Sequence, residues 1–538
     1  MPFQNNFGSG SSPGAVSVIY CEKMQEAIRM SNIDPRWGAW TKQPDPVPRD
    51  QIVKELRCDV AVLGAGIAGT ACALRAAQSG LSVTVLEKAG SWSARGGNIG
   101  VIGSAYMDAR GYRNDPEKIA REWIARCGNR CDEELVWLYL NRSRDAMDWL
   151  IDIVTRPEYG ARPELQACLY AGNTYYEVFG SHRFFDGPMA KKGMRPGAAD
   201  AVYAMVTEAE KLGVRFLFRT PAVELVREDG RIRGAVARTD EGYIRVLAGK
   251  GVVLATGDIG GSPEMCEDLA PLAVRCGVNL YTPKGCNTGD GHRLGLWAGG
   301  ALEDGPFPMV LHPQAYFFAN YCFLFVDGNG KRFMNEDNYI QGKSIAMLRR
   351  NMTSAWSIID GNWRETVPAS IRYGGGIFWD LDHAPDEPGF TPEIGEKMLE
   401  GGLRSGKVVT ADTPEALAEA MGIPADTFAT TLKRYNTDAH AGRDTQFGKR
   451  RELLFPLEKP PFYGLKFGPA VLAVVGGLKV GTDMGVRDEN GAAIPGLYAV
   501  GNAAGGRYGV DYPMLIPGNS HGTALTFGYV LGEQLGRN

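Results

Sequence analysis

The sequence is short of the features that mark metal centres, membrane spans and polyanion-binding surfaces. Its 10 cysteines form no C-x-x-C pair, so we expect neither an iron–sulfur cluster nor a zinc site, and we predict no bound metal. Basic and acidic residues nearly balance, with 58 against 62 and a net charge of −4. This balance argues against nucleic acid or an anionic membrane as a partner. No apolar run is long enough for a transmembrane helix.

A secretion signal is also missing from this sequence. The segment Met1–Tyr20 is polar and rich in Gly and Ser, and no basic stretch followed by an apolar one occurs in it. The cysteine usage fits a reducing compartment. We therefore predict a cytoplasmic protein.

The most informative segment is residues 60–69, VAVLGAGIAG. Its apolar first part predicts a buried strand that runs into a G-x-G-x-x-G turn. A helix is predicted behind it at Thr70–Ser79, and a second strand at Leu81–Leu86 that ends at Glu87. Together these form a β-α-β unit that is typical of dinucleotide binding.

Each residue type in this unit has a physical reason. Gly64 permits the tight turn, Gly66 lets a pyrophosphate approach the backbone, and Gly69 lets the helix pack on the strand. The phosphates would lie at the helix N-terminus, where unpaired N–H groups favour anions. Glu87, 18 residues after Gly69, is placed to accept hydrogen bonds from a ribose.

Changes in composition and hydrophobic pattern along the chain predict a nucleotide-binding domain that is split by an insertion. The predicted parts are an N-terminal extension at 1–55, a first part of the nucleotide domain at 56–263, an inserted domain at 264–461, and a second part at 462–538. Hydrophobic periodicity predicts further elements. They are helices at 116–128, 133–154, 198–212 and 518–536, and a hairpin with strands at 222–226 and 232–238.

Several motifs occur together and in order. Besides the β-α-β unit they are VLATG at 253–257, NTGDG at 287–291, GKRFMNE at 330–336 and GLYAVG at 496–501. Together they make the chain resemble the fumarate reductase / 3-ketosteroid dehydrogenase family of FAD flavoproteins, from about residue 56 to the C-terminus. The resemblance implies an α/β fold: a Rossmann-like FAD-binding domain with an inserted α+β capping domain, and a substrate held between them.

The resemblance also implies which residues contact FAD. The glycine turn would meet the pyrophosphate, Glu87 the adenosine ribose, and Asp290 the flavin or ribityl region. A backbone group of Val223 would meet the adenine, and Asn502 the ribityl chain. The full set of implied cofactor contacts is Gly64, Ala65, Gly66, Ala68, Gly69, Glu87, Lys88, Gly96, Gly97, Val223, Ala255, Thr256, Gly257, Asp290, Gly501, Asn502, Asn519 and Ser520.

Three departures from the family pattern are informative. Members with covalent FAD carry a His just before the Gly-Gly pair, whereas the stretch 90–95 is GSWSAR; we therefore predict non-covalent FAD. Fumarate reductases place an Arg four residues after the Asn-Glu pair, where this chain has Ile340. Their His-His-Thr run corresponds to the apolar residues 472–475. A desolvated dicarboxylate needs cationic partners, so fumarate and succinate are not expected as substrates.

The resemblance to ketosteroid dehydrogenases implies the catalytic residues. Tyr339 lies near the place of their catalytic Tyr, and Tyr512 with Gly518 near the place of their carbonyl-binding pair. Tyr512 and a backbone N–H near Gly518 would donate to the developing oxyanion, and Tyr339 would transfer the proton. His521 lies beside the predicted flavin edge and would either relay protons or cap the helix.

We therefore predict an FAD-dependent oxidoreductase that acts on a CH–CH bond next to a carbonyl in a steroid-like or polyphenol-like cyclic substrate. Hydride would pass through flavin N5, and either direction is open. No second G-x-G-x-x-G unit is present for NAD(P)H, so a separate electron donor or acceptor is expected. Two alternatives remain: a reductase of unsaturated carboxylic acids with basic groups such as Arg507 or Lys343, and an electron-transfer subunit with a degenerate site.

Overall fold

The computed structural model describes residues 37–168, 178–194, 196–280, 284–316, 321–371, 373 and 390–537. The chain forms two compact units, Met1–Pro46 and Val47–Asn538. In the described part of the first unit, a short 3-10 helix spans Ala39–Thr41. The rings of Trp37 and Trp40 stack there with centroids 5.7 Å apart. Residues 1–36 of the predicted extension lie outside the described residues.

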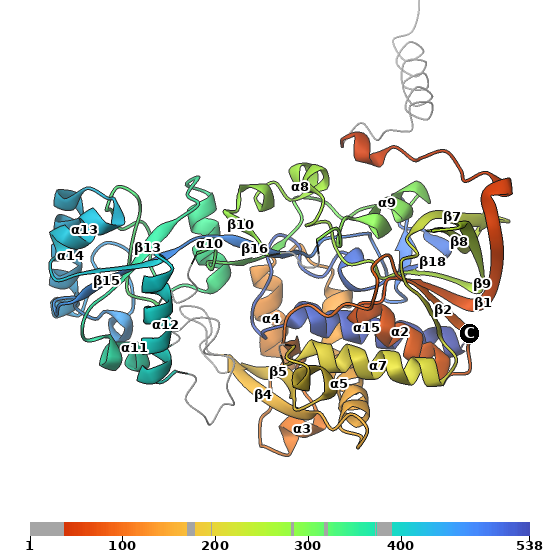
Figure 1. Cartoon of the computed structure of the whole chain (residues 1–538), viewed down its shortest axis with the longest axis horizontal. Helices are drawn as coiled ribbons and strands as arrows, with labels where there is room; N and C mark the ends of the chain where they lie inside the picture. The colour runs from red at the N-terminus through yellow and green to blue at the C-terminus, as the bar shows by residue number, and fades with distance from the viewer. Residues whose placement is uncertain are drawn as a thin grey trace, which may run out of the picture. The chain divides into compact units, whose positions relative to one another are not determined.

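The second unit is built around a largely parallel eight-stranded sheet (Figure 1). The predicted β-α-β unit forms its centre, because β1 pairs parallel with β2 on one side and with β9 on the other. The strands of the main path are, in spatial order, β17 (Gly485–Arg487), β18 (Ala493–Ala499), β9 (Gly242–Leu254), β1 (Ile52–Leu63), β2 (Val83–Leu86) and β6 (Arg215–Leu217). The predicted hairpin, β7 (Ala222–Glu228) and β8 (Arg231–Thr239), joins this sheet through β9.

Helices cover this sheet at its centre. Helix α2 (Ile67–Gln78) packs on β1 and β2, and α15 (Asn519–Arg537) and α7 (Ala198–Lys211) lie beside α2 (Figure 1). Gly528 lets α15 approach α2 closely, because a Cβ at this position would lie 2.3 Å from the carbonyl oxygen of Ala68. This close packing carries the N-terminus of α15 to the same edge of the sheet as the glycine turn.

The expected secondary structure is confirmed, with shifts at the ends. Helix α5 spans Glu133–Val154, as predicted. Helix α2 begins three residues before the predicted Thr70, because the glycine turn continues directly into the helix. Strand β2 begins two residues after the predicted Leu81. Other helices of this region are α3 (Ala105–Asp108), α4 (Pro116–Arg126), α6 (Pro188–Lys191), α8 (Pro263–Leu269) and α9 (Asp290–Trp297).

Three smaller sheets complete the second unit. They are β3–β5–β4, β10–β16–β11 and β12–β13–β15–β14. The predicted domain boundaries stay a prediction, although β15 and β16 lie beyond residue 461 and pair with β13 and β11. Their bounds are β3 (Ile99–Gly100), β4 (Arg162–Cys168), β5 (Val178–Phe185), β10 (Val278–Asn279), β11 (Met309–His312), β12 (Leu324–Val326), β13 (Ala355–Ile359), β14 (Val408–Ala411), β15 (Phe462–Phe467) and β16 (Ala470–Val474).

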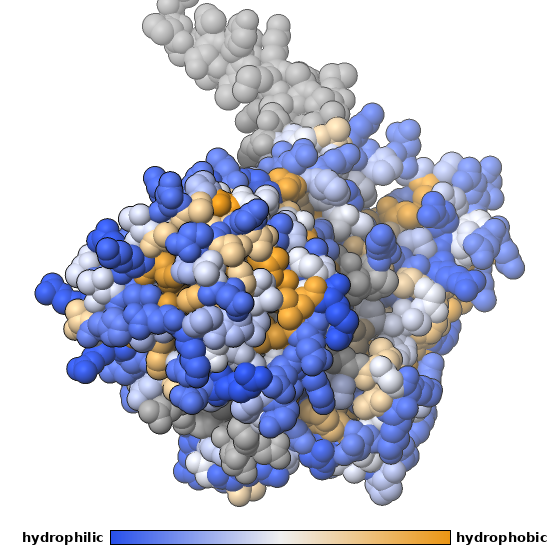
Figure 2. Space-filling model, turned by 60° about the vertical axis from the view of Figure 1, so that its left-hand side comes forward, coloured by the Kyte–Doolittle hydropathy of each residue, from blue (hydrophilic) through white to orange (hydrophobic). Residues whose placement is uncertain are grey.

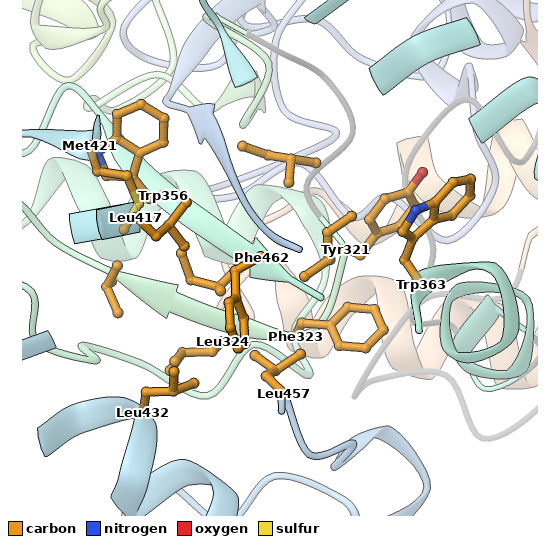
Figure 3. Packing of buried hydrophobic residues seen from close by; sticks show 14 of the residues in the cluster. Tyr321, Phe323, Leu324, Trp356, Trp363, Leu417, Met421, Leu432, Leu457 and Phe462 are labelled. Atoms are coloured by element: carbon orange, nitrogen blue, oxygen red, sulfur yellow. The ribbon is translucent and has the colours of Figure 1, made fainter. Parts of the chain in front are cut away.

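The four-stranded sheet has its own hydrophobic core. Figure 3 shows aromatic and aliphatic side chains of this core turned toward one another, among them Phe323, Trp356 and Phe462. On the face shown in Figure 2, hydrophobic patches are interrupted by hydrophilic residues. The helices around this sheet are α10 (Ile340–Leu348), α11 (Trp363–Ile371), α12 (Pro392–Arg404), α13 (Pro414–Met421) and α14 (Ala425–Ala441).

A buried ion-pair network lies beside this core. The guanidinium of Arg332 contacts the carboxylates of Glu336 at 2.6 Å and Asp444 at 2.8 Å, and all three side chains are at most 1% exposed. Lys449 lies 3.5 Å from Glu336. Burial opposes ionisation of Asp444, but Arg332 and the backbone N–H groups hold the pKa of Asp444 well below its ordinary value. Two residues of the GKRFMNE motif, Arg332 and Glu336, are therefore part of a buried ion-pair network.

Neutralising one member of this network is expected to destabilise the protein. Asp444→Asn leaves the Arg332 charge short of a buried partner, which costs about 3 kcal/mol or more in the free energy of unfolding. The matched control is Glu396→Gln in the exposed pair with Arg364, with an expected cost of about 1 kcal/mol or less. Urea unfolding of both variants measures the difference, and equal costs would contradict it.

Candidate functional site

A cavity of about 510 Å³ opens at the carboxyl ends of β1, β2 and β9. In parallel sheets this edge is where ligands bind. Its walls come from the glycine turn, the 93–98 loop, the 255–258 turn, strands β11 and β16, and the segment around Tyr512. The predicted site residues on the wall are Gly64, Gly66, Ala68, Glu87, Lys88, Gly96, Gly97, Ala255, Thr256, Gly257, Asp290, Gly501, Asn502, Tyr512, Gly518, Ser520 and His521.

The three glycines of the turn meet different surroundings. Gly64 has a φ of +109°, and a Cβ on it would lie 2.4 Å from the carbonyl oxygen of Ala255. A Cβ on Gly69 would lie 2.0 Å from the carbonyl oxygen of Gly64. Gly66, in contrast, faces open space on the cavity wall, with nothing within 4 Å of an added Cβ. Packing therefore explains Gly64 and Gly69 but leaves room for a ligand at Gly66.

Glu87 is held at the end of β2 by backbone groups. Its carboxylate accepts hydrogen bonds from the N–H groups of Ala65 at 2.8 Å and Ala89 at 2.7 Å. Its side chain is largely buried and lines the cavity. Since a carboxylate has about four lone-pair positions, acceptor capacity remains for ribose hydroxyls.

Asp290 lies at the Glu87 end of the cavity. The ammonium of Lys88, the residue after Glu87, contacts the Asp290 carboxylate at 2.8 Å and the Thr288 hydroxyl at 2.6 Å. The resemblance implies contact between Asp290 and the flavin or ribityl region. The ion pair with Lys88 places Asp290 near Glu87, the residue predicted to bind the ribose. The assignment of Asp290 to the flavin therefore stays a prediction.

At another part of the wall, the loop before β3 meets the N-terminus of α15. A Cβ on Gly96 would lie 3.0 Å from Cε1 of His521, and one on Gly518 would lie 2.2 Å from the carbonyl oxygen of Asn98. Nδ1 of His521 lies 2.8 Å from the same carbonyl oxygen. Because a carbonyl only accepts, Nδ1 carries the proton and Nε2 has the free lone pair. Burial lowers the pKa of His521, which keeps the ring neutral.

Asn502 presents a buried oxygen with no partner among the described residues. Its Nδ2 donates toward Asp258 at 3.4 Å, whereas its Oδ1 has no hydrogen bond. Asn502 lines the cavity directly after Gly501. Burying an unpaired polar atom costs free energy unless a ligand or water forms a hydrogen bond with it. A hydroxyl group of a ribityl chain would donate such a bond.

Tyr512 is buried on the cavity wall. Its hydroxyl oxygen accepts the backbone N–H of Ser520 at 3.1 Å, so its own proton is available to a ligand. Its ring packs against Tyr508 with centroids 5.3 Å apart. Burial raises the pKa of Tyr512, and Tyr508 raises it further. The hydroxyl therefore stays protonated at neutral pH.

Five predicted residues do not line the cavity. Tyr339 donates its hydroxyl hydrogen to the Asp511 carboxylate instead, and burial raises the pKa of Tyr339. Asn519 is fully buried and bonds Pro513 and Tyr508. The other three are Ala65, Gly69 and Val223, whose neighbours in the chain line the wall.

Several wall residues were missed by the sequence reasoning. Arg95 and Asp258 directly adjoin predicted motifs, and that adjacency was an available signal. Arg95 donates to the Leu472 carbonyl at 2.7 Å and lies 3.9 Å from Asp258. His312 and Gln314 also line the cavity. They come from and just after β11, and no local sequence pattern marks them.

These features fit a bound dinucleotide. Gly66 is the N-cap residue of α2, and no side chain caps the helix, so its first N–H groups are open to phosphates. The open space at Gly66 and the unpaired Asn502 oxygen lie on the same cavity wall. Within the described ranges, no cluster of three His, Cys, Asp or Glu residues is placed to hold a metal ion. No helix in the same ranges has the length and apolarity needed to cross a membrane.

Comparison with known proteins decides the family. A model of the FAD binding domain family matches residues 59–515. This chain belongs to that family. The protein is an FAD-dependent oxidoreductase, as predicted, and its expected likeness to the fumarate reductase / 3-ketosteroid dehydrogenase group is confirmed.

Two relatives and one solved structure are especially similar to it. Vinyl phenol reductase of Lactiplantibacillus plantarum is 29% identical over 512 residues, covering 89% of this chain and 96% of that protein. The 4-oxocyclohex-2-ene-1-carboxylate 5-dehydrogenase of Sinomonas cyclohexanicum is 28% identical, covering 90% and 94%. The structure of 3-ketosteroid-delta4-(5alpha)-dehydrogenase from Rhodococcus jostii with 4-androstene-3,17-dione has 25% identity and a TM-score of 0.70. It covers 92% of this chain and 100% of that one.

Substitution of Gly66 is expected to affect cofactor binding and not folding. We expect Gly66→Ala to change the free energy of unfolding of the apoprotein by about 0.5 kcal/mol or less, because its Cβ meets only open space. If the pyrophosphate approaches the backbone at Gly66 as the motif predicts, the same Cβ obstructs it and the variant should lose most of its FAD. Flavin absorbance per mole of protein measures this loss. Gly328→Ala, also in open space but away from the cavity, is the control; equal flavin content in the two variants would contradict the assignment.

Proposed function

We propose that this oxidoreductase interconverts a CH–CH bond next to a ring carbonyl, or next to a phenol ring, with the conjugated C=C bond. The observation that carries the proposal is the Tyr512 hydroxyl on the cavity wall, which accepts the Ser520 N–H and keeps its proton for a ligand. The names of the two relatives describe a vinyl phenol and an oxocyclohexene carboxylate, and the solved structure holds an androstenedione. All three have unsaturation and an oxygen substituent on a ring system.

The proposed roles follow from hydrogen-bonding capacity. FAD would supply hydride transfer at its N5 atom. Tyr512 would donate to the substrate oxygen on which charge develops, which lowers the barrier. Gly518 lines the cavity, and its N–H has no acceptor among the described residues, so it would be the second donor. His521, neutral and with a free Nε2, would exchange the proton at the neighbouring carbon.

The cavity walls also favour a neutral ring over a dicarboxylate. Val310, Leu472 and Ala473 supply apolar surface from β11 and β16. The basic residues proposed for an unsaturated acid do not line the cavity: Arg507 donates to the Ala504 carbonyl at 2.7 Å, and Lys343 contacts Cys322 at 3.2 Å. Neither of these two residues therefore supports an acid substrate. We further propose that a separate carrier exchanges electrons with the flavin.

Reoxidation of the reduced holoenzyme tests the substrate class. Photoreduced enzyme is mixed without oxygen with cyclohex-2-enone, 4-vinylphenol, 4-androstene-3,17-dione or fumarate, and flavin absorbance is followed. We expect at least one ring compound to reoxidise the flavin and fumarate to leave it reduced. The saturated products are tested in reverse with oxidised enzyme. If no ring compound reacts in either direction, the proposed class is wrong; reaction with a protein carrier alone would favour an electron-transfer subunit.

Tyr512→Phe removes the proposed donor without changing the ring. We expect flavin turnover by the reactive compound to slow by about a hundredfold, as for the loss of one oxyanion donor. Tyr159→Phe is the matched control. The Tyr159 hydroxyl donates to the Glu208 carboxylate at 2.6 Å, and Tyr159 does not line the cavity. Unchanged turnover in Tyr512→Phe would exclude Tyr512 from the mechanism.

We also propose that FAD is bound without a covalent link. The stretch 90–95 before Gly96 contains no His. Acid precipitation should therefore release all of the flavin into the supernatant. A yellow pellet whose tryptic peptides carry flavin would overturn this prediction.

A further inference from the structure

Three groups converge on the carboxylate of Asp511. Its Oδ1 accepts the Gln341 side-chain amide at 2.9 Å and the backbone N–H of Tyr512 at 2.9 Å. Its Oδ2 accepts the Tyr339 hydroxyl. The Arg126 guanidinium lies over the Tyr339 ring, 5.1 Å from its centroid. Asp511 is thus the common partner of two side chains from the start of α10 and of the backbone next to it.

Gln341 extends this network to the cavity wall. Its Oε1 accepts the Leu311 N–H at 2.8 Å, and its Nε2 also donates to the Met309 carbonyl. Both partners belong to β11, whose Val310 and His312 line the cavity. Gln341 is only 1% exposed, so these bonds are not shared with bulk water. Asp511 therefore connects strand β11 with the segment that carries Tyr512.

Tyr512 is held at both ends by this arrangement. Its backbone N–H bonds Asp511, and its hydroxyl bonds the Ser520 N–H at the start of α15. A donor must be held within a fraction of an ångström of its working position, because small displacements cost large factors in rate. The Asp511 bonds fix the backbone end of this donor.

We propose that Asp511 is a positioning residue, which couples the β11 wall to the Tyr512 donor, and that Tyr339 acts through Asp511 and not on the substrate. This inference rests on the proposed function of Tyr512. It assigns to Tyr339 a role different from the proton transfer that the resemblance implies. The reason is geometric: the Tyr339 hydroxyl is used by Asp511, and Tyr339 does not line the cavity.

A double-mutant cycle on the holoenzyme tests the inference. Tyr339→Phe removes one hydrogen bond to a carboxylate, and we expect kcat with the reactive ring compound to fall about tenfold. Asp511→Ala should lower kcat further, and Tyr339→Phe should then have no added effect in the Asp511→Ala background. If Asp511→Ala does not give folded holoenzyme, Gln341→Met replaces it in the cycle, with the same expected loss of additivity. Tyr159→Phe is again the control.

Two further measurements separate positioning from proton transfer. The dissociation constant of the unreactive ligand p-cresol, followed by flavin absorbance, should change less than about threefold, since the apolar walls remain. Amide hydrogen exchange of the peptides that contain 309–312 and 506–518 should become faster in both regions in Tyr339→Phe. Fully additive losses in the cycle, with unchanged exchange, would identify Tyr339 as a direct proton donor and overturn the inference.

The role proposed for Asp511 can fail independently of the proposed function, and the experiments distinguish the two failures. Hydrogen exchange needs no substrate, so it reports the link between β11 and the Tyr512 segment even if no ring compound reacts. If wild-type enzyme reacts and Tyr512→Phe is slow, but Tyr339→Phe behaves as Tyr159→Phe, the inference alone fails.

Discussion

The contact between the turn after β1 and the turn after β9 is the constraint on which the cavity depends. The backbone at Gly64 lies so close to the Ala255 carbonyl that no side chain fits, and Gly69 lies equally close to Gly64. This packing directs the uncapped start of α2 into the cavity. The same packing leaves Gly66 in open space, where a phosphate can approach. Binding of the dinucleotide is therefore a consequence of how two parallel strands end side by side.

A second constraint comes from the segment between the two parts of the main sheet. Strands β11 and β16 close the cavity with mostly apolar side chains, and the cations nearby are engaged within the protein. Lys88 bonds Asp290, and Arg95 bonds the Leu472 carbonyl. A desolvated dicarboxylate requires free cationic donors, and these two cations already bond within the protein. The electrostatics of the wall and the position of Tyr512 both support the proposed substrate class.

Sequence reasoning could place residues on the cavity wall where a short motif fixes their position, and it could not detect a contact with a distant partner. Gly64, Gly66 and Glu87 lie on the cavity wall, because a β-α-β unit leaves its glycines and its acid little freedom. Asn502 lies there directly after Gly501. Tyr339 was assigned by its place after the Asn-Glu motif, yet its hydroxyl bonds Asp511, 172 residues away in the chain. Motif spacing carries no information about such a partner. Asn519 similarly starts the predicted helix but turns its amide to Pro513 and Tyr508.

The sequence by itself determined the α/β fold, the FAD-binding family and the lack of a C-x-x-C motif, because these depend on short-range patterns: apolar periodicity, glycine spacing and cysteine spacing. Only the tertiary structure decided which side chains from β11, α10 and the segment between them line the cavity or bond to its wall. His312, Gln314 and Gln341 carry no local signal, and their positions follow from the pairing of β11 with β16 and from the docking of α10 against the Asp511 segment. Such positions are set by contacts between residues far apart in the chain, where side-chain packing and hydrogen-bond geometry, and not local pattern, select the arrangement.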